Sequence, residues 1–264
     1  MQKQRRIDRL RFGLLLVLMA LPLDRSWSQD GTTLYKIEDI DPKATPSFFT
    51  PQLLRFLHFS DWPNTPIEAI RTPDHPHTIG MLKKTVIPVP LAAVVTLTEQ
   101  FEAYPKIWED LLESKILSRD RNRTYVEITR KRPTFFMPKI NFQMVYVSDK
   151  SQAGHVVYRQ QLIKGNQVKT SDSLVILDQV SDTQTSIKVV NFFDPDLGLL
   201  NSIAPSKIWS ESLKAGISDD QAFRLKLEHP DWSVEQISEE AKKSTKNFRA
   251  DQIPSVNLSQ IQLN

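Results

Sequence analysis

Between residues 111 and 194 the sequence repeats one pattern, in which an extended, partly apolar run is followed by a short polar turn. Residues 140–146 alternate apolar and polar side chains, which is the period of a strand with one buried face. Asp, Asn, Ser and Gly favour tight turns. They are concentrated in the segments between the runs, namely RDRN (119–122), SDKSQAG (148–154), KGNQ (164–167) and SDTQ (181–184). The pattern predicts about six antiparallel strands.

Short helices are expected before this series of strands. Residues 81–90 are predicted as a first strand, after which Pro90 suits the first turn of a helix over 91–101. The pair Tyr104-Pro105 predicts an elbow, and a second helical turn or two is expected after it.

Helices are expected again after Asp194-Pro195. A helix over 206–216 is predicted to stop at Gly216, and two more are predicted to begin at capping boxes, Ser218–Gln221 and Ser233–Gln236. The pair Asp219-Asp220 is then expected on a solvated helical face.

This order of elements predicts an α+β fold, in which a curved antiparallel sheet grips a C-terminal helix. A sheet with one apolar face is covered by such a helix. A helix held in this way tends to leave a cavity, with the short helices near its mouth.

The first 28 residues are expected to be a signal peptide. A basic head precedes the apolar run Phe12–Leu23, and Ser26 and Ser28 are small residues suited to cleavage. The run is shorter than the roughly 20 apolar residues that span a bilayer. The sequence therefore predicts export, with the mature protein periplasmic or secreted.

Charge and cysteine content exclude several classes of function. Residues 1–28 hold six of the 34 basic and two of the 31 acidic side chains, which leaves 28 against 29 and a net charge of −1. A nucleic-acid partner is not expected without a basic excess. The absence of cysteine excludes disulfides, thiolate catalysis and cysteine-ligated zinc.

Four regions are predicted along the chain. They are the signal peptide (1–28), an N-terminal extension (29–80), the main domain (81–216), and a C-terminal helical extension and tail (217–264).

The main domain resembles the START-like (SRPBCC, helix-grip) superfamily, and within it the coenzyme Q-binding and polyketide-cyclase-type members. The resemblance is carried by Pro88–Val95 at the start of the first helix, by the elbow Phe101–Pro105 and by Glu113–Arg119 in the second strand. It extends over about 81–216 and implies the helix-grip fold. It implies less about function, because one fold hosts many.

Signals for catalysis or metal binding are weak. No nucleophile elbow, zinc-protease helix, phosphate loop or dinucleotide fingerprint is present. Histidines cluster only in Asp74-His75-Pro76-His77, where a third ligand is not evident, so no metal site is predicted. No cofactor is implied, and an enzymatic role is the less favoured interpretation.

The ligand expected in the cavity is a hydrophobic small molecule or a lipid. Polar strand residues that could also face it include Arg159 and Asn191. The same apolar residue types build filled cores, so both interpretations remain open at this point. The predicted lining is Phe142, Met144, Tyr146, Tyr158, Leu174, Ile176 and Trp209, with Tyr104 and Trp108 near the mouth.

The segment 130–139 is a candidate for a transient membrane contact, because cations flank an aromatic pair. Alternatively, its apolar residues continue the sheet or pack on the N-terminal extension. The docking candidates are Arg130, Lys131, Arg132, Phe135, Phe136 and Lys139.

Together these features predict an exported protein that binds or transfers a lipid or an isoprenoid-like molecule. Two alternatives remain, a cavity enzyme of cyclase or hydrolase type and an envelope protein–protein interaction module with a filled core.

Overall fold

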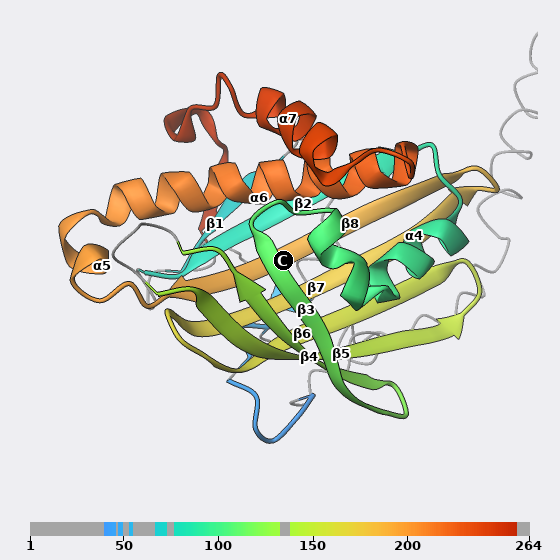
Figure 1. Ribbon diagram of the computed structural model, residues 1–264, viewed down its shortest axis with the longest axis horizontal. Helices are drawn as coiled ribbons and strands as arrows, with labels where there is room; N and C mark the ends of the chain where they lie inside the picture. Colours follow the sequence, from blue (N-terminus) through green and yellow to red (C-terminus); the bar gives the residue numbers. More distant parts are fainter. Residues whose placement is uncertain are drawn as a thin grey trace, which may run out of the picture.

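The computed structural model describes residues 40–45, 47–49, 53–54, 67–72, 77–132 and 138–257. In these ranges the strands form one curved sheet, α6 lies along one face of it, and α7 is stacked on α6 (Figure 1). No helix in the described ranges is both long and apolar enough to cross a membrane. The predicted signal peptide lies outside the described residues.

The sheet contains nine described strands in the order β3-β4-β5-β6-β7-β8-β2-β1-β9. All neighbours are antiparallel except β1 and β9, which are parallel. The strands are β1 (Glu68–Arg71), β2 (Ile79–Ile87), β3 (Leu111–Asp120), β4 (Arg123–Arg130), β5 (Ile140–Gln152), β6 (His155–Gly165), β7 (Val168–Ser181), β8 (Gln184–Pro195) and β9 (Ser255–Asn257). The six strands predicted after the elbow are β3 to β8.

The described helices are α4 (Leu91–Glu99), the 3-10 helix η1 (Phe101–Lys106), α5 (Leu199–Ile203), α6 (Pro205–Glu228), α7 (Val234–Ser244) and the 3-10 helix η2 (Ala250–Gln252). The strand–helix–helix–strands–helix order is the predicted helix-grip architecture. We call the face of the sheet that carries α4 and α6 the inner face and the opposite one the outer face.

The elbow between α4 and β3 forms as predicted, but the connection is shorter than expected, because η1 ends at Lys106 and β3 begins at Leu111. The Tyr104 hydroxyl donates to the Thr98 carbonyl at 2.6 Å, which fixes the bend. The expected second helical segment was wrong, because Leu111 already begins β3. Pairing with β4 satisfies the backbone groups of this segment instead.

Helix α6 passes through the predicted stop at Gly216 and through the predicted capping box at Ser218, so both predictions were wrong. A Cβ atom on Gly216 would lie 2.7 Å from Met81 Sδ. The glycine thus permits close approach of α6 to β2 rather than ending the helix. The second capping box is confirmed, because Ser233 and Gln236 exchange hydrogen bonds at the start of α7.

Both predicted extensions contribute to the sheet. The N-terminal region provides β1 and the C-terminal region provides β9, which pairs with it. The predicted boundary between residues 80 and 81 falls within β2, and the one at 216 falls within α6.

A segment that we call the strap, residues 40–45, 47–49 and 53–54, packs on the outer face. Its buried Phe49, Leu53 and Leu54 join an apolar cluster with Val190 and Phe192 of β8. The strap therefore covers one face of the sheet while α4 and α6 cover the other.

Polar contacts fix the strap to the sheet. Asp172 accepts hydrogen bonds from Ser47 Oγ at 2.6 Å and from the Phe48 amide at 2.9 Å. Arg159 pairs with Asp172 at 3.4 Å, and both side chains are almost fully buried. Burial raises the pKa of Asp172, and the Arg159 guanidinium acts in the opposite direction.

We predict that Asp172→Leu lowers the free energy of unfolding by about 3 kcal/mol, because it leaves the Arg159 charge buried without its carboxylate. Urea denaturation measures the change. The double variant Arg159→Met/Asp172→Leu should recover most of the loss. A single variant as stable as the double one would contradict this account of the strap.

Candidate ligand-binding site

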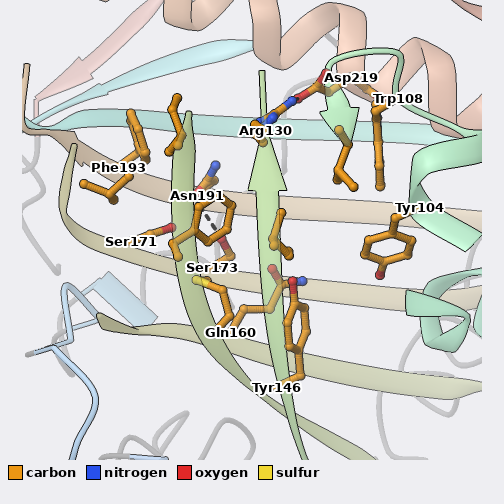
Figure 2. Close-up of a pocket in the computed structure, with 16 residues that line it drawn as sticks. Tyr104, Trp108, Arg130, Tyr146, Gln160, Ser171, Ser173, Asn191, Phe193 and Asp219 are labelled. Carbon is orange, nitrogen blue, oxygen red and sulfur yellow. Dashed lines mark hydrogen bonds and ion pairs between the residues drawn. The ribbon is translucent and has the colours of Figure 1, made fainter. Parts of the chain in front are cut away.

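A cavity of about 280 Å³ lies between the inner face and the helices η1 and α6. Figure 2 shows its lining residues, which come from both the sheet and the helical layer. The apolar and aromatic part of the wall consists of Tyr104, Trp108, Leu111, Ile128, Ile140, Phe142, Met144, Tyr146, Val168 and Phe193. The polar part consists of Arg130, Gln160, Ser171, Ser173, Asn191 and Asp219.

Five of the residues predicted to line a cavity do face it, namely Tyr104, Trp108, Phe142, Met144 and Tyr146. The three on β5 share one face because strand side chains alternate. That they contact a ligand stays a prediction.

Leu174 and Ile176 were placed wrongly on the cavity wall. Ser171 and Ser173 of the same strand line the cavity, so alternation directs Leu174 and Ile176 to the outer face. There Leu174 and Ile176 pack in the cluster beneath the strap. Selection by apolar character alone missed this, because in this part of β7 the residues that face the cavity are the two serines, and the apolar Leu174 and Ile176 face outward.

Trp209 and Tyr158 lie outside the cavity as well. Trp209 packs at the β2 side of α6, where the Arg71 guanidinium lies 4.0 Å from the centre of its ring. Tyr158 faces inward but lines a second pocket, and its hydroxyl donates to Glu99 at 3.0 Å.

A row of polar side chains crosses the cavity floor. Tyr146, Gln160, Ser173 and Asn191 are direct neighbours on β5, β6, β7 and β8. Ser173 Oγ donates to Asn191 Oδ1 at 2.8 Å, a bond drawn in Figure 2. The Gln160 side chain has no hydrogen-bond partner among the described residues. The row therefore offers amide groups to a ligand.

Sequence reasoning found part of this row. Asn191 faces the cavity, as was considered for it, whereas Arg159 points outward to Asp172. Gln160 was missed, although alternation from Tyr158, which was predicted to face the cavity, places it inward. Ser173 was missed because the predicted inward placement of Leu174 and Ile176 puts it on the other face. Strand register, which the sequence did not give, brings them together.

Arg130 closes one edge of the cavity. Its guanidinium pairs with Asp110, in the turn before β3, at 2.7 Å. It also pairs with Asp219 of α6 at 3.1 Å, as Figure 2 shows. The Trp108 indole donates to the Asp219 carbonyl at 3.0 Å. Burial raises the pKa of Asp219, while the Arg130 charge opposes that shift.

The expectation that Asp219 and Asp220 are simply solvated was wrong. While Asp219 binds Arg130 of β4, Asp220 binds Lys83 of β2 at 3.0 Å. Lys83 also donates to the Gly216 carbonyl at 3.2 Å. Helix α6 is thus tied to both sides of the cavity.

The candidate docking segment has a different arrangement from the one proposed. Arg130 is engaged in its ion pairs, and Lys131 Nζ lies 3.8 Å from Glu109. Arg132 and Lys139 are exposed. Phe135 and Phe136 lie outside the described residues, so their part in membrane contact stays a prediction.

Helix α7 is tied to the turn beside the cavity through Glu109. This carboxylate accepts from Ser238 Oγ and pairs with Lys242 Nζ at 2.7 Å. These hydrogen bonds lower the pKa of Glu109 from 4.5 to about 2. The charge of Glu109 therefore contributes to stability fully above pH 4.5, and this contribution is lost as the pH falls toward 2.

We predict that Glu109→Gln lowers the melting temperature by about 2 °C at neutral pH, since a half-exposed ion pair contributes less than about 1 kcal/mol. Thermal unfolding from pH 7 to pH 2 measures the difference from wild type. The difference should shrink below pH 4.5 and vanish near pH 2. A difference that is constant over this range would contradict the role given to the charge.

Within the described ranges no group of three or more His, Asp or Glu side chains is arranged to hold a metal ion. His75 lies outside the described residues. The cavity wall itself contains aromatic, amide and hydroxyl groups with one ion pair at its edge.

Comparison with known proteins gives structural likenesses only. No family model matches the sequence, and no curated protein matches it. A START superfamily protein from Mycobacterium smegmatis is 13% identical, with a TM-score of 0.44 over 57% of this chain and 98% of the other. The Zhui aromatase/cyclase from Streptomyces sp. R1128 is 13% identical, with a TM-score of 0.44 over 67% and 99%.

The lipid transfer and protein localization domain of human StarD13 is 11% identical, with a TM-score of 0.43 over 60% of this chain and 86% of that one. The assignment of the fold rests on the topology and not on these likenesses. By its topology the chain has the predicted helix-grip α+β fold.

Proposed function

We propose that this protein binds a hydrophobic small molecule, a lipid or an isoprenoid-like compound, in the cavity beneath α6. The observation that carries the proposal is a cavity of about 280 Å³ whose wall is mostly aromatic and apolar. This volume is slightly below the range of roughly 300–1,000 Å³ for ligand pockets.

The chemistry of the wall supports a ligand with one polar group. Burial of apolar ligand surface contributes about 25 cal/mol per Å². The amides of Gln160 and Asn191 stand in the polar row and can donate to a carbonyl or hydroxyl oxygen. Affinity would thus come from the apolar wall and orientation from the row.

Two alternatives fit the site less well. A cavity enzyme needs an acid or base free to act on its substrate. Here Asp219 is bound by Arg130, and the Tyr104 hydroxyl donates to the Thr98 carbonyl. Burial raises the pKa of the Tyr146 hydroxyl, which disfavours its use as a base. An interaction module with a filled core does not call for a hollow interior.

Export and membrane contact are parts of the same proposal. The basic head and apolar run of residues 1–28 support export to the periplasm or beyond. An exported carrier has to take up its ligand from a membrane or from another protein. The exposed cations Arg132 and Lys139 support a transient contact of the segment 130–139 with an anionic bilayer.

We predict that Met144→Trp, which fills the cavity, abolishes the stoichiometric binding of a lipid-like ligand. Native mass spectrometry of protein purified without detergent, followed by organic extraction, measures what is bound. Val180→Trp is the matched control, because Val180 of β7 is 54% exposed and lies outside the cavity. An empty wild-type protein that also takes up no lipid from vesicles would contradict the proposal.

We further predict that Asn191→Leu weakens binding of a ligand with a carbonyl group about fivefold, the effect of one hydrogen bond of about 1 kcal/mol. Binding of the matching hydrocarbon should not weaken. Fluorescence displacement with both ligands measures the two affinities. If the affinities for both ligands fall equally, the polar row does not bind the carbonyl group.

A further inference from the structure

A second pocket of about 190 Å³ lies beside the cavity, at the turn between β3 and β4. Tyr146 lines both spaces. The Tyr146 ring meets Phe101 edge-on, with 4.6 Å between ring centres. The two spaces are therefore adjacent, and these two aromatic rings stand where they meet.

The second pocket differs from the cavity in its charge. Three cations line it, Arg119, Arg121 and Lys150, against a single carboxylate, Glu99. Lys150 Nζ lies 2.6 Å from Glu99 Oε1 and neutralises it. Neither arginine has an ion-pair partner among the described residues, so the pocket carries an excess of two positive charges.

The backbone holds both arginines at this pocket. They flank Asp120, which pairs with Arg123 across a two-residue turn. Arg121 has φ of 50°, a left-handed conformation that asparagine or glycine adopts more easily.

Neutral donors complete the lining. Asn122, Thr124 and Ser148 face the same pocket and can donate to oxygen atoms. Guanidinium groups bind carboxylate and phosphate oxygens through paired hydrogen bonds. The pocket thus has the composition of a site for a small oxyanion.

We propose that the second pocket binds the anionic end, a carboxylate or a phosphate, of an amphipathic ligand whose apolar part occupies the cavity. This inference rests on the proposed function, because it takes the cavity as the site of the apolar part. Occupation of both spaces requires the Tyr146 side chain to turn away from Phe101. The ligand class is then an anionic single-chain amphiphile rather than a neutral lipid.

The test compares dodecanoate with dodecanol, which have the same chain length and differ in charge, by calorimetric titration of the full chain. A third titration uses inorganic phosphate alone. Wild type should bind dodecanoate at least about tenfold more tightly than dodecanol, as expected for charge-assisted hydrogen bonds. High salt should reduce this preference.

The variant Arg119→Gln/Arg121→Asn should lose the preference for dodecanoate and bind dodecanol as wild type does, which also shows that it is folded. The matched control Lys106→Gln/Lys115→Gln removes two exposed cations that do not line the pocket, and it should keep the preference.

The outcomes separate the two proposals. If wild type binds dodecanol and dodecanoate equally, or if the arginine variant keeps the preference, the anionic ligand is excluded and the hydrophobic carrier stands. If wild type binds neither chain, the carrier fails and this inference fails with it. Binding of phosphate alone, without a preference for dodecanoate, would overturn the amphiphile in favour of a free oxyanion.

Discussion

The cavity depends on how α6 is held across the sheet. Two consecutive carboxylates of the helix point to opposite sides, Asp219 to Arg130 of β4 and Asp220 to Lys83 of β2. In the sheet, β5, β6, β7 and β8 lie between these two strands. The helix is thus anchored above both margins of the cavity floor, and on the β2 side Gly216 brings it into close contact with Met81. These anchors hold α6 across the cavity while its β2 side packs against the sheet.

Alternation along the central strands determines what lies on each side of the sheet. On β6, Arg159 points outward and Gln160 inward, and on β7, Asp172 points outward and Ser173 inward. The outward pair ties the strap down, while the inward pair forms part of the cavity floor. A slip of one residue in either strand would bring a charge into the cavity and leave its partner unpaired. The strap therefore helps to fix the register on which the cavity depends.

The sequence predicted which segments form helices and strands better than it predicted where these elements end and which residues they contact. Turn chemistry and alternation predicted β3 to β8, Pro90 predicted α4, and Tyr104-Pro105 predicted the bend that follows it, because these signals are local. Gly216 was misread as a helix stop, since its role comes from contact with Met81, which is distant in sequence. The cavity residues on β5 were found because they are aromatic or apolar. Ser171 and Ser173 on β7 were missed because they are polar, and only strand pairing places Ser173 beside Asn191.

The charge of each pocket also could not be predicted from the sequence. The chain without its first 28 residues is almost neutral, with a net charge of −1, and this balance says little about any one pocket. Charges in water are screened over about 8 Å at physiological ionic strength, so a bound group responds mainly to the residues around it. Arg119 and Arg121 adjoin one pocket, while Asp219 and Arg130 neutralise each other at the other. Local pairing, which is set by the fold, therefore makes one space suited to an anion and leaves the other suited to an apolar chain.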